Sequence, residues 1–278
     1  MNSTKQITHA MELVASSKLR KARQKAECRR AYFEVMIQSM QELAAHQTGN
    51  IKNVYLEERQ GEKSLTIVIT ADRGLAGGYN SNVIKLASSN IKDKESAKLI
   101  IVGRKGKDFF KNREYNIVDE YIGISENPSY NDALQIGEKA ISLFKSGEVD
   151  HVNLVYTKFV STLTQKAELI KLLPLNKEVL QEEKVMENKD EIPLIMGYEP
   201  DVESLLGYLI PKYVINTIYG AIIEGSASEQ GARRIAMEAA TENANEMIDN
   251  LSLRYNRARQ EQITQEIAEI VAGASASK

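Results

Sequence analysis

Residues 211–274 read PKYVINTIYGAIIEGSASEQGARRIAMEAATENANEMIDNLSLRYNRARQEQITQEIAEIVAGA, with no proline after the first position. Apolar or small residues recur in this stretch at steps of three and four, the spacing of one face of a helix. A helix of this length would be roughly 95 Å long. Pro211 suits a first helical turn and Gly273 suits the end. The sequence therefore predicts one helix far longer than a globular core requires.

The apolar stripe of this helix changes along its length. The section from Ala221 to Ala239 consists mainly of small residues, which let a partner helix approach closely. From Met247 to Ile270 the stripe becomes sparser and bulkier. We expect a paired section followed by a tip that leaves its partner, and a long helix in an ordinary bundle remains the alternative. The stripe consists of Val214, Ile218, Ala221, Gly225, Ser228, Ala232, Ile235, Ala239, Met247, Leu251, Tyr255, Ala258, Ile263, Ile267 and Ile270.

The N-terminal residues, from 2 to about 57, also predict one long helix because they contain no proline. Their stripe again has small residues in its middle, so the two terminal helices could pair as an antiparallel coiled coil. The stripe consists of Ile7, Met11, Val14, Ala22, Ala26, Phe33, Met36, Ile37, Met40, Leu43 and Ala44.

The middle of the chain alternates strands with helices, which predicts an open, mostly parallel α/β sheet. The expected strands are 64–70, 97–102, 115–121 and 151–157, and the expected helices are 80–93, a short helix ending near 113, and 130–145. Residues 161–173 alternate polar and apolar side chains, as in an edge strand or a hairpin. The chain thus divides into an N-terminal coiled-coil helix (1–57), an inserted Rossmann-like α/β domain (58–175), an acidic linker and foot (176–200) and a C-terminal coiled-coil helix (201–278).

The charge of this 278-residue chain is unevenly distributed, although the net charge is only −2. Residues 1–30 contain eight Lys or Arg and two Glu, a net charge of +6. The basic run from Lys18 to Arg30 could be a solvated helix face, bind nucleic acid or a membrane surface, or face an acidic protein. It contains no aromatic residue, so stacking on single-stranded nucleic acid is not expected. No run approaches the roughly 18 apolar residues of a membrane span.

Few residues point to chemistry. The turn after the first strand, Arg73–Gly78, has neither the G-x-G-x-x-G spacing nor the Lys-Ser/Thr ending of a phosphate-binding loop. The three histidines and the single cysteine, Cys28, lack the spacing of a metal site and cannot form an internal disulfide. We therefore expect no catalytic residue, no metal and no cofactor.

Four motifs make the arrangement specific. They are ITHAMELVASSKLRK (7–21), ADRGLAGG (71–78), GARRIAMEAATEN (231–243) and NRARQEQITQEI (256–267). Together they resemble the γ subunit of F-type ATP synthases of the bacterial type, over essentially the whole chain and in the same order. The resemblance implies a rotor whose paired helices form a shaft inside a ring of three α and three β subunits. The inserted domain, with the ε subunit, would stand on the membrane c-ring.

The resemblance also implies roles for individual residues, and catalysis would belong to the β subunits. The tip would sit in an apolar bearing of the ring, with neighbouring polar residues bonded to a β-subunit loop. A basic collar on the N-terminal helix would face an acidic β-subunit loop, and the Gly-rich turn would touch the same region. The implied ring contacts are Lys18, Arg20, Lys21, Arg23, Asp72, Arg73, Arg233, Arg259, Gln260, Ile263, Thr264, Ile267, Ile270 and Val271. The implied foot contacts are Tyr198 and Glu199, near the c-ring.

The sequence departs from the family pattern in three places. Met1 lies almost at the first motif, where the family has four or five more helical turns, so we expect a truncated chain or an internal start. Ala76 stands where many members have Cys, and no cysteine pair is present for thiol control. The implied location is the cytoplasmic side of the cell membrane, as a peripheral subunit without nucleic acid. The alternative is an independent coiled-coil protein with a nucleotide-binding α/β domain.

Overall fold

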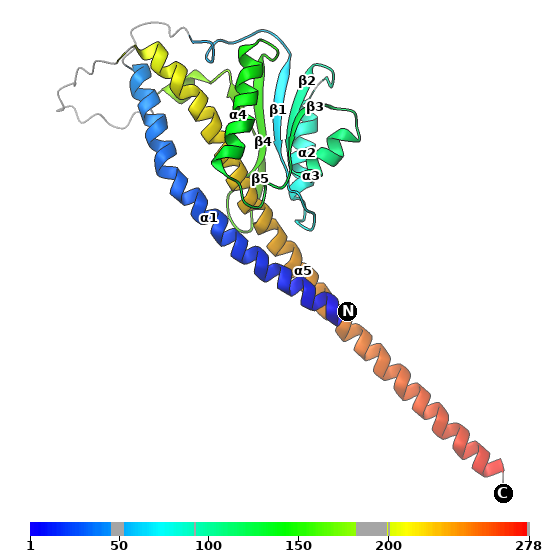
Figure 1. Cartoon of the computed structure of the whole chain (residues 1–278). Coiled ribbons are helices and arrows are strands. Elements are labelled where there is room, and N and C mark those ends of the chain that lie inside the picture. The colour runs from blue at the N-terminus through cyan, green and yellow to red at the C-terminus, as the bar shows by residue number, and fades with distance from the viewer. Residues whose placement is uncertain (46–52, 92, 182–198, 200, 277–278) are drawn as a thin grey trace.

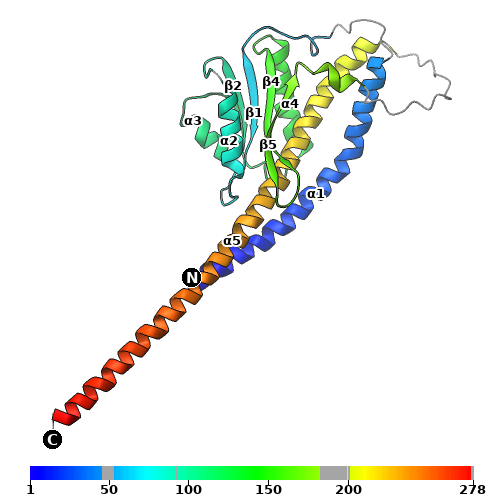
Figure 2. The ribbon, with the colours of Figure 1, turned by 180° about the vertical axis from the view of Figure 1, so that it is seen from behind.

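Two long helices and an inserted α/β domain make up the protein (Figure 1). The computed structural model describes residues 1–45, 53–91, 93–181, 199 and 201–276. Helix α1 (Asn2–Ala45) runs antiparallel to helix α5 (Val202–Ala276), and the α/β domain lies beside the upper part of this pair (Figures 1 and 2). The predicted fold class, an antiparallel pair of terminal helices with an inserted α/β domain, is confirmed.

Helix α1 is shorter than the sequence predicted. Within the described residues the helix covers Asn2–Ala45, and residues 53–63 are a turn followed by chain without regular structure, so the predicted helix does not reach residue 57. The Asn53 side chain accepts a 3.0 Å hydrogen bond from the backbone N–H of Tyr55, which is the turn that a short polar side chain favours over helix. This turn directs Tyr55 and Leu56 into the core, where each is 5% exposed.

The seam between α1 and α5 is lined by small residues, although its register near the N-terminus differs from the prediction. Thr8 and Ala15 are buried there, while Ile7 and Val14 are 57% and 54% exposed. The Thr241 hydroxyl of α5 donates a 2.7 Å hydrogen bond to the Thr8 hydroxyl, so the helices meet closely at this level. A close approach favours small side chains, and the bulky residues one position earlier are therefore turned outward.

The inserted domain contains a five-stranded sheet in the order β3-β2-β1-β4-β5. The first four strands are parallel, and β5 pairs antiparallel with β4 at the edge, as the alternating pattern predicted. The strands are β1 (Ser64–Ile69), β2 (Ala97–Val102), β3 (Asn116–Tyr121), β4 (His151–Phe159) and β5 (Gln165–Leu173). The connecting helices are α2 (Tyr79–Asn90), α3 (Arg104–Lys111) and α4 (Tyr130–Lys145), and a 3-10 turn, η1, covers Lys177–Leu180.

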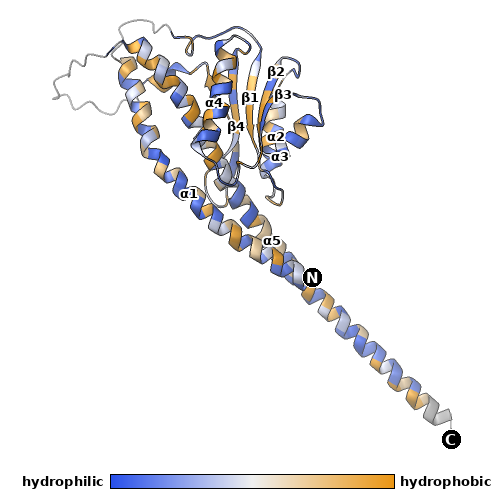
Figure 3. Ribbon diagram, viewed as in Figure 1, coloured by the Kyte–Doolittle hydropathy of each residue, from blue (hydrophilic) through white to orange (hydrophobic). Residues whose placement is uncertain are grey.

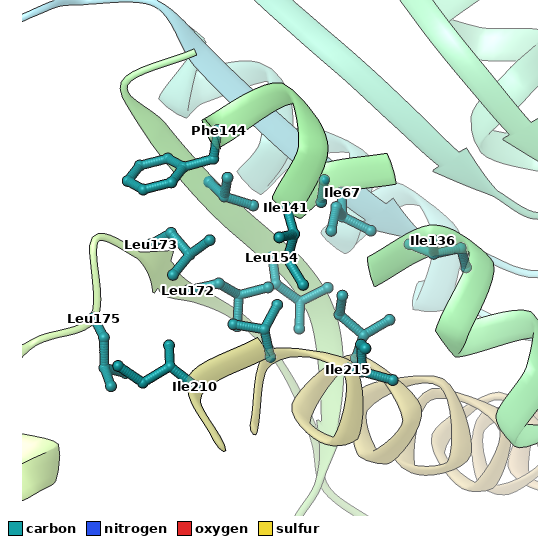
Figure 4. Close-up of a cluster of buried hydrophobic side chains, with 14 of the residues drawn as sticks. Ile67, Ile136, Ile141, Phe144, Leu154, Leu172, Leu173, Leu175, Ile210 and Ile215 are labelled. Atoms are coloured by element: carbon teal, nitrogen blue, oxygen red, sulfur yellow. The ribbon is translucent and has the colours of Figure 1, made fainter. Parts of the chain in front are cut away.

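Both faces of the sheet are covered, which explains why its central strands are mostly apolar and buried. Helices α2 and α3 cover one face, where Val83 and Phe110 are fully buried. Helices α4 and α5 cover the other face. Figure 4 shows that core, in which side chains from α4, the sheet and α5 interlock: Ile67, Ile136, Ile141, Phe144, Leu154, Leu172, Leu173, Leu175, Ile210 and Ile215. The upper part of α5 is thus an element of the domain core as well as half of the coiled coil.

Helix α5 begins before Pro211 and continues past Gly273, so neither of these residues marks its end. Its start is fixed by Asp201, whose carboxylate accepts a 2.8 Å hydrogen bond from the backbone N–H of Ser204. Pro211 has no N–H to donate to the Gly207 carbonyl, so one helical hydrogen bond is missing. The helix continues through Pro211 because burial of the neighbouring Leu206 and Ile210 stabilises it.

By length and composition, α5 could cross a membrane, and it is the one such helix among the described residues. However, 56% of its apolar window is buried inside the protein, as in the core helix of a domain. Beyond the domain, every side chain from Leu251 to Ala272 is exposed, and this part projects as a single helix (Figures 1 and 3). The predicted tip without a partner helix is therefore confirmed.

Candidate functional site: the surface of the shaft

The projecting tip of α5 carries large apolar side chains in solvent. Ile263, Ile267, Ile270 and Val271 are 47–71% exposed. At 3.6 residues per turn, these four positions fall within an arc of about 100° on the helix surface. A lone helix with such a stripe has little to stabilise it in water, because helices owe most of their stability to packing of an apolar face. The stripe therefore defines a surface for a partner.

Polar residues flank this stripe. Arg259, Gln260 and Thr264 are all exposed, as expected for residues that bond to a partner. The Thr264 hydroxyl donates a 2.8 Å hydrogen bond to the Gln260 carbonyl one turn earlier. This bond uses the hydroxyl hydrogen and leaves oxygen lone pairs free, so Thr264 is oriented as a hydrogen-bond acceptor toward solvent.

The basic collar on α1 is less uniform than the sequence indicated. Arg20, Lys21 and Arg23 are exposed, and the Arg23 guanidinium lies 6.0 Å from the centre of the Phe159 ring on β4. Lys18, in contrast, is half-buried, and its Nζ lies 2.9 Å from Oε2 of Glu126 in the α/β domain. Three of the four collar residues thus present their charge to solvent, and the fourth already has an acidic partner.

The Gly-rich turn, residues 72–78, lies beside this collar. The Arg73 Nε is 3.7 Å from Oε1 of Glu126, so Arg73 and Lys18 share one carboxylate. Asp72 accepts hydrogen bonds from the Ser125 hydroxyl (2.7 Å) and from the Arg104 backbone N–H (3.1 Å). Both Asp72 oxygens are therefore engaged within the chain, and its role here is to shape the turn.

Arg233 is buried behind the same turn, not exposed on the shaft. Its Nη2 lies 2.7 Å from Oε1 of Glu229 and donates a 3.2 Å hydrogen bond to the Gly74 carbonyl. Burial raises the pKa of Glu229 from its usual value, and the Arg233 charge opposes that shift. Arg233 lies roughly 39 Å along the helix from Arg259. It anchors the Gly-rich turn to α5 and is separate from the tip.

Two features of this region escaped the sequence reasoning. Leu75, in the middle of the Gly-rich turn, is 63% exposed and has a φ of 61°, a left-handed conformation that is unfavourable for leucine. Glu126 was not predicted as a site residue, because a single acidic residue in a loop belongs to no sequence motif. The available signal for Leu75 was an apolar residue between glycines.

Helix α5 occupies the place where a Rossmann-like sheet would hold a nucleotide. That place is the carboxyl end of the strands where the order reverses, here between β1 and β4. The Ser228 hydroxyl donates to the Thr157 carbonyl at the end of β4, and Gly225 lies against Tyr79 and Ile69. The buried Glu229 carboxylate beside the Gly-rich turn opposes a phosphate there.

The remaining candidates among the described residues form no metal-binding cluster. Within the described part of the chain, no group of three or more His, Cys, Asp or Glu could hold a metal ion. His9 lies on the surface of α1, 3.2 Å from Glu12, and Cys28 is an exposed free thiol. His46 and the foot residue Tyr198 lie outside the described residues, whereas Glu199 is exposed.

An inserted α/β domain on an antiparallel helix pair, with one helix projecting as an exposed tip, defines a shaft-like protein. Comparison with known proteins identifies the class further. A family model described as ATP synthase matches residues 1–276. The ATP synthase gamma chain, sodium ion specific, of Acetobacterium woodii is 54% identical over 99% of this chain and 95% of its own length. The ATP synthase gamma chain of Alkaliphilus metalliredigens is 52% identical over 100% and 95%. The chain belongs to the ATP synthase gamma chain family.

Solved structures agree on the fold. A central-stalk chain of the Tetrahymena thermophila mitochondrial ATP synthase superposes with a TM-score of 0.64 at 24% identity, covering 84% of this chain and 99% of the other. A chain of the Euglena gracilis mitochondrial ATP synthase gives 0.58 at 18% identity, covering 96% and 95%. Family membership favours the non-catalytic stalk over the independent nucleotide-binding protein.

Proposed function

We propose that this chain is the central rotary stalk of an F-type ATP synthase, and that it transmits ion-driven rotation to catalytic sites on the β subunits. The observation that carries the proposal is the projecting part of α5, where exposed apolar residues lie on one arc of a single helix. This surface fits an apolar bearing formed by a ring of three α and three β subunits. The flanking Arg259, Gln260 and Thr264 would bond to the ring.

The chain's own part in catalysis is mechanical. An asymmetric shaft makes different contacts with each β subunit, and it shifts a conformational equilibrium only as far as those contacts differ in free energy. Arg20, Lys21 and Arg23 are exposed on α1 and fit an acidic β-subunit surface. Arg73 and Leu75 extend that surface onto the Gly-rich turn.

At the opposite end, we propose that the α/β domain, with an ε subunit, stands on the membrane c-ring, with Tyr198 and Glu199 at the foot. The chain would then be peripheral to the cytoplasmic side of the cell membrane. The similarity to a gamma chain described as sodium ion specific makes sodium a coupling ion to test beside the proton. The coupling ion belongs to the c-ring and not to this chain.

Co-assembly tests the proposal directly. The purified chain is mixed with α and β subunits from the same source, and the mass and ATPase rate of the product are measured. One copy of this chain per three α and three β, with hydrolysis far above that of the separate subunits, is expected. A mixture that never forms this complex, with this chain or with one extended upstream of Met1, would contradict the stalk role.

The collar is tested by charge reversal. Replacing Arg20 and Lys21 with Glu should lower ATP-driven ion transport per ATP hydrolysed, because both residues would repel an acidic ring surface. The matched control reverses Lys139 and Lys145 on α4, outside the collar, and should leave this ratio unchanged. Equal ratios for the two variants would show that the collar is only a solvated face.

A further inference from the structure

The loop Gly123–Pro128, between β3 and α4, lies against the middle of α1. Lys18 Nζ is 2.9 Å from Oε2 of Glu126, and Lys25 Nζ donates a 2.6 Å hydrogen bond to Oδ1 of Asn127. Lys18 and Lys25 are two helical turns apart, so their side chains leave α1 on the same face. The loop therefore bridges two turns of α1.

The other side of this loop is fixed to the Gly-rich turn. The Ser125 hydroxyl, in a residue only 4% exposed, donates a 2.7 Å hydrogen bond to Oδ2 of Asp72. Arg73 Nε lies 3.7 Å from the second oxygen of Glu126. The hydrogen bond from Lys18 is the main cause that lowers the pKa of Glu126, so this carboxylate is ionised at neutral pH. One carboxylate thus joins α1 to the α/β domain.

We propose that Glu126 is a positioning residue that clamps the collar face of α1 to the inserted domain, so that shaft and domain turn as one body. The inference rests on the proposed rotary function. Force applied to the collar would reach the domain through the seam with α5, through the contact of Arg23 with Phe159 and through this loop.

The clamp is tested first in the chain alone, by amide hydrogen exchange of residues 11–25 in Glu126→Gln. The Lys18 and Glu126 side chains are 40% and 33% exposed, so an increase in exchange of about twofold to fivefold is expected, with a smaller increase at high salt. Glu138→Gln, an exposed carboxylate on α4, is the matched control. The swap Lys18→Glu with Glu126→Lys should restore protection, and far-ultraviolet circular dichroism checks the folding of each variant.

The mechanical role is tested in the whole ATP synthase complex, reconstituted in sealed vesicles. Glu126→Gln should lower ions transported per ATP by about twofold. The charge swap should restore exchange protection but not this ratio, since Glu at position 18 repels an acidic ring. Unchanged exchange in Glu126→Gln, or increased exchange with an unchanged ratio, would overturn the clamp. Failure to assemble, by both the unaltered chain and one extended upstream of Met1, would instead refute the rotary function, and the exchange data would still decide whether the contact exists.

Discussion

Arg29 lies inside the seam between α1 and α5, and its replacement tests how the two helices are joined. Its Nη1 donates a 2.5 Å hydrogen bond to the Asn216 carbonyl, and its guanidinium lies 4.8 Å from the centre of the Phe33 ring. A Cβ at Gly220 would lie 2.1 Å from Nη2, so the glycine makes room for the guanidinium. Replacement by Met keeps much of the stem volume but removes the charge and the donors.

The expected cost follows from these contacts. A hydrogen bond from a charged donor contributes about 1.5–3 kcal/mol, and a cation over an aromatic ring about 0.5–2 kcal/mol. Burial lowers the pKa of Arg29, which shows that desolvation of the charge opposes these gains. We therefore expect Arg29→Met to lower the free energy of unfolding by about 2–3 kcal/mol.

The cost should also depend on pH through Glu224, which lies near Arg29. Burial raises the pKa of Glu224, and Arg29 opposes this shift. An acid with a raised folded pKa contributes stability below its unfolded pKa and loses it as pH rises through the folded pKa. Removing Arg29 raises the folded pKa further, so Arg29→Met should cost more near pH 7.5 than near pH 5, by at most about 1.4 kcal/mol per pH unit.

Urea denaturation followed by circular dichroism measures these effects at about pH 5 and about pH 7.5. The set comprises the unaltered chain, Arg29→Met, Glu224→Gln and the double variant, and the pH dependence of the cost should disappear in the Glu224→Gln background. Arg30→Met is the control, because Arg30 is 80% exposed and should change stability by less than about 0.5 kcal/mol. Equal costs at both pH values in both backgrounds would refute the coupling, and a cost below about 1 kcal/mol would refute the structural role.

Three further predictions concern packing, the tip and the Gly-rich turn. Gly137→Ala should destabilise the domain in urea denaturation, because its Cβ would lie 2.6 Å from Ile215 Cγ1, whereas Gly207→Ala, with only an amide at 3.6 Å, should not. Ile267→Ser should leave the thermal stability of the free chain unchanged but weaken co-assembly with α and β subunits, and equal assembly would argue against a bearing. Leu75→Gly should raise the free energy of unfolding by about 0.5–1 kcal/mol by relieving the strain at φ 61°, and a loss would show that Leu75 packs.

Much of the inserted domain could be predicted from local sequence. Strand β2 and helix α4 have the predicted bounds because both carry strong local signals. A left-handed Gly103 ends β2, and Ser129 and Asp132 cap each other's backbone N–H groups at the start of α4. The antiparallel edge strand could also be predicted, because a strand with one buried face alternates polar and apolar side chains.

The contacts by which α1, α5 and the Gly-rich turn meet could not be predicted, because they join residues that are distant in sequence. Ile7 and Thr8 are adjacent, and only the hydroxyl of Thr241 on the other helix shows which of them faces the seam. Arg233 is buried only because the Gly-rich turn supplies a carbonyl and α5 supplies Glu229. Glu126 gains its role from Lys18, 108 positions away. The ring contacts of the tip and collar remain predictions.

The side chains of helix α5 follow one helical repeat, but the helix passes through three environments. These three environments explain both its length and its composition. Beside the sheet it presents large apolar residues such as Ile210 and Ile215 to the core. Where it passes the carboxyl ends of the strands, it buries polar residues: Ser226, Ser228, Glu229, Gln230 and Arg233. Among these residues, the Ser228 hydroxyl donates to the Thr157 carbonyl, and Arg233 donates to the Gly74 carbonyl and pairs with Glu229 on the same helix. Beyond that point the same helix leaves the domain, and no described residue of the chain covers its isoleucines, as the proposed insertion into a ring of other subunits requires.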